Sequence, residues 1–186
     1  DKTSRLKPAL GRSARDDAML VQATQWLLFP ALMAFAAPSD LITMTISNRV
    51  SLLLAGGFAV LALVTGMSLV EIGWHLAAGA LVLVVAFGFF ARGWIGGGDA
   101  KLAAATALWF GFGHLLDYVV YASLFGGVLT LLLLQVRSWP LPGVLLHQPW
   151  AQRLHDRNSG VPYGIALAAA ALTVYPHTGW MAVPGL

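Results

Sequence analysis

Four acidic residues stand out in the apolar middle of this 186-residue chain, in which only 10% of the residues are charged. Between residues 19 and 136 the acids are Asp40, Glu71, Asp99 and Asp117. A carboxylate within or beside a membrane-spanning segment is costly, so it indicates a functional site. Three glycines at positions 96–98 come directly before Asp99. Glycine lets the backbone take a positive φ, and it also lets another group approach closely.

Two carboxylates a few ångströms apart cannot both ionise easily, so one keeps a proton while the other is charged. The charged one can take a proton from water while the protonated one polarises a carbonyl, as in aspartic proteases. Paired membrane carboxylates can also relay protons in a transporter or channel subunit. Taken singly, Asp99 could be a helix N-cap and Asp40 could simply end an apolar segment. The residues alone leave these alternatives open.

The composition predicts that membrane helices position these acids. The chain is 58% hydrophobic, and its charged fraction lies far below the value of about 25% that is typical of soluble domains. The net charge of +3 comes largely from ends and loops, so it indicates orientation in a lipid membrane and not nucleic-acid binding. The absence of cysteine excludes thiolate nucleophiles and Cys-ligated zinc. The histidines share no ligand spacing, so we expect neither a metal nor another cofactor.

Apolar runs of about 17–25 residues, the length that crosses a bilayer, predict an all-α polytopic membrane protein with about six transmembrane helices. The runs lie at Met19–Ser39, Ser51–Leu69, Ile72–Ala91, Ala100–Leu116, Tyr118–Val136 and Val161–Tyr175. Residues 1–18 form a basic N-terminal tail, which we expect to be mobile or to lie on a surface. Residues 19–186 then form a single membrane domain. We expect the seven tryptophans to be interfacial anchors.

The basic residues of the joins between runs predict the orientation. Those after the first, third and fifth runs hold Arg49, Arg92, Lys101, Arg137, Arg153 and Arg157, whereas those after the second and fourth hold no Lys or Arg. The positive-inside rule places the odd-numbered joins in the cytoplasm, although the basic tail favours the opposite orientation. By the same parity, Asp40 and Asp99 share one membrane face, and the other two acids share the opposite face.

Three ordered segments resemble those of the type IV prepilin peptidases, and most of all their short Tad/Flp (CpaA-like) branch. That family has an aspartate followed by a hydrophobic-Pro-Asn element, then a Gly-x-Gly-Asp element, then a Pro-Tyr-Gly element before the last span. The corresponding segments here are Asp40–Arg49, Gly96–Leu102 and Val161–Gly164, with Ser47 in place of the proline. The longer branch has a Cys-rich zinc region associated with N-methylation, so this cysteine-free chain resembles the peptidase-only form.

The resemblance implies an intramembrane aspartyl endopeptidase of the bacterial inner membrane, with Asp40 and Asp99 as its catalytic residues. Its substrate would be the helix of a prepilin or pseudopilin, cut after a glycine at the cytoplasmic face. A lesser, substrate-positioning role would fall to Asn48, Gly96, Gly98, Lys101, Pro162, Tyr163 and Gly164. For Asn48 and Lys101, an ordinary loop residue and an interfacial lysine are the alternatives. A proton-coupled transporter and a non-catalytic scaffold of a secretion assembly are the competing functions.

Overall fold

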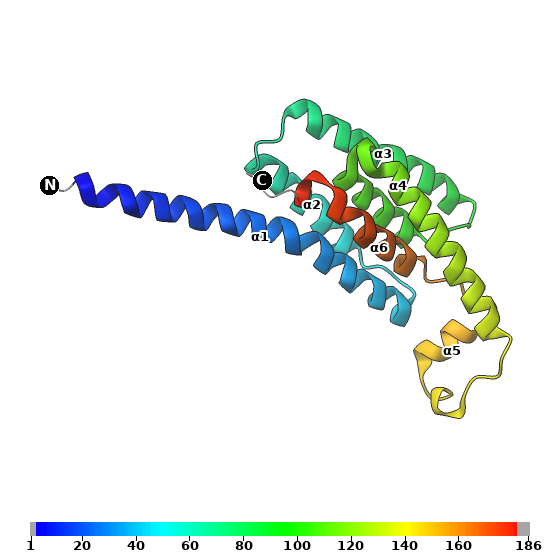
Figure 1. Ribbon diagram of the computed structural model, residues 1–186. Helices are drawn as coiled ribbons and strands as arrows, with labels where there is room; N and C mark the ends of the chain where they lie inside the picture. The colour runs from blue at the N-terminus through cyan, green and yellow to red at the C-terminus, as the bar shows by residue number, and fades with distance from the viewer. Residues whose placement is uncertain (1–2, 182–186) are drawn as a thin grey trace.

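The computed structural model describes the backbone of residues 3–181 and the side chains of residues 16–181. All regular structure in this part is helical, which confirms the all-α fold class for the described residues. The α-helices are α1 (Thr3–Thr43), α2 (Asn48–Val64), α3 (Leu69–Ala91), α4 (Gly97–Arg137), α5 (Pro149–His155) and α6 (Tyr163–Val174). Short 3-10 turns are η1 (Gly143–Leu145), η2 (Tyr175–His177) and η3 (Gly179–Met181). Figure 1 shows α2, α3, α4 and α6 packed with the C-terminal part of α1.

Helix α4 consists of two arms joined at Gly111, where φ is 57° and ψ is −170°. Two carbonyls near this break have partners from other elements. The Leu108 carbonyl lies 2.7 Å from Nδ1 of His75, and the Trp109 carbonyl accepts a 2.7 Å hydrogen bond from Nε1 of Trp180. The arms run in opposite directions, so both ends of α4 lie at the same end of the bundle (Figure 1).

Three described helical segments are long and apolar enough to cross a membrane, with α4 counted as one helix: Asp16–Thr43, α3 and α4. Helix α2 is a shorter apolar helix, and α6 has only 12 residues. The predicted count of about six transmembrane helices is therefore not confirmed. The predicted join between the fourth and fifth runs, at residues 113–117, was a few residues late, because the break lies at Gly111.

The N-terminal helix joins the predicted tail to the first apolar run. Helix α1 is continuous from Thr3 to Thr43, and its first half extends away from the other helices in Figure 1. Most of the segment expected to be a separate tail is thus helical. The boundary at residue 18 and the single membrane domain over 19–186 stay predictions.

An aromatic core occupies the end of the bundle that contains Gly111. The rings of Phe29 and Tyr175 stack with centroids 4.4 Å apart, and those of Trp109 and Trp180 lie 5.1 Å apart. Nε1 of Trp109 donates to the Leu54 carbonyl at 2.9 Å. Trp109 and Trp180 are buried, so the expectation that every tryptophan is an interfacial anchor was wrong for these two.

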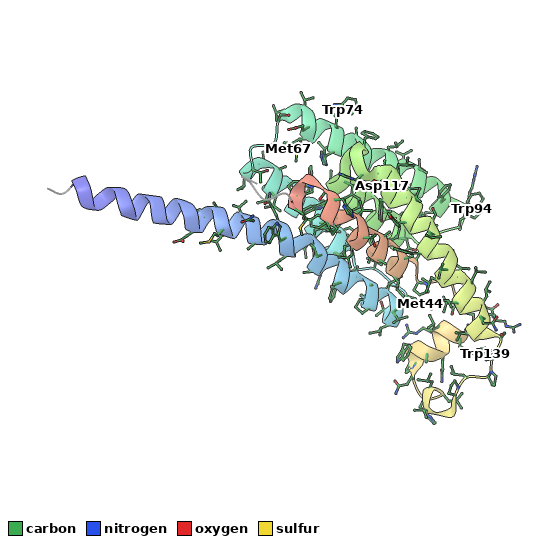
Figure 2. All side chains as sticks on the ribbon, in the orientation of Figure 1. Met44, Met67, Trp74, Trp94, Asp117 and Trp139 are labelled. Carbon is green, nitrogen blue, oxygen red and sulfur yellow. The ribbon has the colours of Figure 1, made fainter. Side chains whose placement is uncertain are left out.

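Three exposed tryptophans, Trp74, Trp94 and Trp139, lie toward the ends of the bundle, and a fourth, Trp26, is exposed within α1. In Figure 2, Trp74 lies toward the same end as Met67 and Asp117, and Trp94 and Trp139 lie with Met44 toward the other end. The joins thus alternate between ends along the chain, as the parity of the apolar runs predicts.

Candidate active site

Asp40 lies in the last turn of α1, with only 4% of its surface exposed. Its Oδ2 atom accepts a 2.8 Å hydrogen bond from the backbone amide of Gly164. Gly164 belongs to the first turn of α6, where amides have no partner within their own helix. Asp40 therefore caps α6 from another helix, and the positive end of the α6 dipole favours a carboxylate at this place. Asp40 thus lies in the last turn of α1 and in addition makes a contact with α6, which the alternative of a residue that simply ends an apolar segment does not include.

A tight turn before α6 aims the Gly164 amide at Asp40. Pro162 has φ −73° and ψ 80°, and the Tyr163 amide donates to the Val161 carbonyl at 2.8 Å, which is an inverse γ-turn. The proline ring fixes φ near the value that this turn requires. A Cβ atom on Gly164 would lie 2.8 Å from Oδ2 of Asp40, so this position has no room for a side chain.

Asp99 lies in the first turn of α4 and is half-buried. Its Oδ2 atom accepts a 3.2 Å hydrogen bond from the backbone amide of Gly96, which is the N-cap residue. The N-cap interpretation of Asp99 was therefore wrong in detail, because the carboxylate reaches back to the cap from the third helical position.

The glycines before Asp99 permit a close approach and not an unusual backbone conformation. None of the three residues at 96–98 has a positive φ, so of the two properties of glycine only the close approach is used here. At Gly98, an added Cβ would lie 3.1 Å from Cβ and 3.2 Å from the backbone nitrogen of Ile46. Gly98 thus lets the start of α4 contact the segment that follows α1.

Ile46 lies between the two aspartate segments. Its backbone faces Gly98, and its Cδ1 atom lies where a side chain on Gly164 would be, 2.8 Å from the Cβ position. Asp40 and Asp99 are thereby brought to the same end of the bundle, on the two sides of Ile46. Ile46 is not among the site residues predicted from the sequence. The available signal was an apolar residue directly before Ser47, in the hydrophobic element of the motif.

A polar pair joins the same two segments at the surface. Nζ of Lys101 donates a 2.8 Å hydrogen bond to Oδ1 of Asn48, so the lysine contacts Asn48. Ser47, which replaces the usual proline, is the N-cap of α2, and its Oγ accepts from the Arg49 amide at 3.3 Å. Its φ of −63° is one that proline also adopts, so the backbone at this position is compatible with the proline of the motif.

Tyr163 directs its side chain away from the aspartates. Its ring packs on Gly126 in the second arm of α4, where an added Cβ would lie 3.2 Å from Cε1. Its hydroxyl lies 3.2 Å from the Thr130 hydroxyl. The structure therefore gives Tyr163 contacts with α4, whereas the neighbouring Gly164 contacts Asp40.

A cavity lies at the other end of the bundle. It has a volume of about 690 Å³ and is lined by aromatic residues together with Glu71, His75 and His114. Nδ1 of His114 is 3.9 Å from a carboxylate oxygen of Asp117. Among the described residues, no group of three or more His, Asp or Glu could hold a metal ion.

The amino-acid sequence matches the model of one protein family. Residues 27–131, more than half of the chain, match the model of the type IV leader peptidase family. The matched stretch contains both aspartates, and the segment from Pro162 to Gly164 lies beyond it. Comparisons with curated proteins and with solved structures gave no match. The chain, a protease built from apolar helices, therefore belongs to the type IV leader peptidase family.

Proposed function

We propose that this protein is an intramembrane aspartyl endopeptidase that removes the leader peptides of type IV prepilins and pseudopilins. Asp40 and Asp99 are its catalytic pair. The observation that supports this most directly is the convergence of the two carboxylates, from α1 and α4, at one end of the bundle. Among the four acids of the apolar region, only these two come from segments that Ile46 joins.

The pair holds one proton between its two carboxyl groups, because neighbouring carboxylates do not both ionise easily. The charged carboxylate takes a proton from water as the water oxygen attacks the carbonyl carbon of the scissile peptide bond. The protonated carboxyl gives its proton to the carbonyl oxygen, which forms a gem-diol. The carboxyl that gained a proton then delivers it to the departing nitrogen while the C–N bond breaks. One hydroxyl of the gem-diol returns its proton to the other carboxylate, which leaves a carboxylic acid product and restores the singly protonated pair.

The substrate enters laterally from the bilayer as a helix and must unwind locally, because the carbonyls of a helix are hydrogen-bonded internally. A glycine before the cleavage point lowers the cost of that unwinding. In the enzyme, Gly96 and Gly98 provide backbone without side chains next to Asp99. Asn48 and Lys101, already bonded to each other, form a polar rim around the same place.

The active site faces the cytoplasm in the bacterial inner membrane. The joins at the aspartate end of the bundle carry Arg49 and Arg92, as the positive-inside rule requires of cytoplasmic joins. The chain has no cysteine and therefore lacks the zinc region of the longer branch. We propose cleavage of the leader without methylation of the new N-terminus.

The test is cleavage of a purified prepilin, with a glycine before its hydrophobic helix, by the protein reconstituted in lipid. Asp40→Asn and Asp99→Asn should each abolish cleavage, because each removes the acid or the base. Asp117→Asn, at the other end of the bundle, is the matched control and should cleave normally. EDTA should have no effect. Robust cleavage by Asp40→Asn or Asp99→Asn, or loss of activity with EDTA, would contradict the aspartyl mechanism.

A further inference from the structure

Arg137 is a buried cation at the end of α4, with 8% of its surface exposed. Both of its hydrogen-bond partners are backbone carbonyls. Nε donates to the Leu154 carbonyl at 2.7 Å, and Nη2 donates to the Gly160 carbonyl at 2.9 Å. Burial of a guanidinium is costly unless its donors are used, and charged donors make stronger hydrogen bonds than neutral ones. The arginine therefore fixes the chain on both sides of the turn that leads back to α6.

The second arm of α4, which ends at Arg137, also contacts Tyr163 in the segment that follows Gly160. Thr130 lies beside the Tyr163 hydroxyl, and Gly126 gives room to the Tyr163 ring. Gly126, Thr130 and Arg137 recur at spacings of four and seven residues, so they share one face of the helix. This face contacts the segment from 160 to 163 at three places.

Gly164 follows immediately, and its amide donates to Asp40 at 2.8 Å. The position of this amide depends on the four residues before it, which begin at the Gly160 carbonyl held by Arg137. The inverse γ-turn at Pro162 makes this short connection stiff. A displacement at Gly160 is therefore transmitted to the hydrogen bond on Asp40.

We propose that Arg137 is a positioning residue of the active site, which acts with Thr130 through Tyr163 and Gly164 to orient the carboxylate of Asp40. This proposal rests on the proposed function, because it assigns Asp40 a part in the reaction. Arg137 itself does not touch substrate. Its effect is on the geometry of Asp40, and so on the chemical step and not on substrate binding.

Two substitutions test this inference in the full-length protein reconstituted in lipid. Arg137→Lys keeps the charge but cannot reproduce the planar pair of donors that reaches two carbonyls. Tyr163→Phe keeps the ring against Gly126 and removes only the hydroxyl next to Thr130. We expect kcat for prepilin cleavage to fall at least about tenfold in Arg137→Lys, and less in Tyr163→Phe, because small misplacements of a reacting group are costly. KM should stay within about twofold, since ground-state binding is unchanged.

The matched control is Arg153→Lys. Arg153 is exposed on α5, and its Nε lies 3.3 Å from the Pro149 carbonyl, within its own helix. Arg153→Lys should leave kcat unchanged. Hydrogen–deuterium exchange of residues 160–166 is the second readout, and it should be faster in Arg137→Lys than in the wild type and in Arg153→Lys.

Wild-type kcat and exchange in both Arg137→Lys and Tyr163→Phe, with cleavage still abolished by Asp40→Asn, would overturn the positioning role alone. A rise in KM with unchanged kcat would also overturn it, since that pattern indicates substrate binding. If the wild-type protein cleaves no prepilin, the proposed function fails, and the role of Arg137 in the reaction fails with it. The exchange data distinguish this outcome, because they report the Arg137 contact without any substrate.

Discussion

The carboxylate of Asp40 accepts a hydrogen bond from the backbone amide of Gly164, although the two residues lie far apart along the chain. The contact joins the C-terminal turn of α1 to the N-terminal turn of α6. It places the Pro-Tyr-Gly segment beside a candidate catalytic residue, even though this segment lies outside the stretch that matches the family model. The third motif thus contributes the Gly164 amide as a hydrogen-bond donor to Asp40. Gly164 leaves room for the carboxylate, and Pro162 fixes the turn that aims the amide at it.

The first prediction concerns Gly164. A methyl group at this position would lie 2.8 Å from both Oδ2 of Asp40 and Cδ1 of Ile46, so one of these groups must move. A shift of about 1 Å in a reacting group can cost roughly a hundredfold in rate. We expect Gly164→Ala to insert in the membrane and to cleave prepilin about a hundredfold more slowly than the wild type, as measured by turnover.

Gly127→Ala is the control for this measurement, because nothing lies within 4 Å of the added Cβ. It should cleave at the wild-type rate. Near-normal turnover by Gly164→Ala would mean that the Asp40 contact tolerates displacement, and the amide of Gly164 would then have no part in catalysis.

Gly98 carries the second prediction. If it were an ordinary residue of the first turn of α4, alanine should change stability by about 1 kcal/mol or less. The structure instead places Ile46 backbone 3.2 Å from the added Cβ, and a backbone neighbour cannot rotate away as a side chain can. Gly98→Ala should therefore separate Asp99 from Asp40 and cleave poorly, with only a modest loss of thermal stability in detergent. Gly88→Ala, which meets nothing within 4 Å, should change neither quantity.

Sequence patterns are sufficient to predict the helical fold class and the location of Asp40 and Asp99 at the same end of the bundle. Both features depend on properties that are local along the chain. Apolar runs separated by short polar joins predict helices, and the parity of the joins brings Asp40 and Asp99 to one end. The burial of Trp109 depends instead on a carbonyl of α2 that accepts from its indole, which no local pattern contains.

The other differences between the predictions and the structure also arise from tertiary contacts. The reversal of α4 occurs at Gly111 because His75 of α3 packs against it, whereas nearby Gly113 is equally acceptable from the sequence. From the sequence, Arg137 is an ordinary basic residue of a cytoplasmic join. Its hydrogen bond to the Gly160 carbonyl exists only in the folded chain. Ile46 is one apolar residue in a short loop, and its contact with Gly98 requires two helices to meet.

The third prediction concerns orientation in the membrane. The basic joins place positions 49 and 153 in the cytoplasm and positions 71 and 117 outside. Because the chain has no cysteine, single cysteines introduced at these four positions report accessibility without background. Cysteines at 71 and 117 should react with an impermeant thiol reagent added to intact cells. Labelling at 49 and 153 instead would invert the orientation and move the aspartates to the outer face.

The last prediction concerns Gly111, which separates the arms of α4. Its φ of 57° and ψ of −170° lie in a region that almost only glycine occupies, and an added Cβ would be 3.1 Å from the His75 ring. Alanine must therefore strain the backbone or restore the helix through the break, at a cost of about 1–3 kcal/mol. We expect Gly111→Ala to lower the thermal midpoint in detergent. It should also reduce cleavage, because the second arm positions the segment before Gly164.

Gly113→Ala provides the comparison, since this glycine has neither a positive φ nor an atom within 4 Å of an added Cβ. An exposed helical position of this kind should gain up to about 1 kcal/mol from alanine. The two variants should therefore shift the thermal midpoint in opposite directions. Equal stability of Gly111→Ala and Gly113→Ala would mean that the reversal of α4 does not depend on the glycine at 111. The placement of Arg137 beside the segment that precedes α6 would then need another cause.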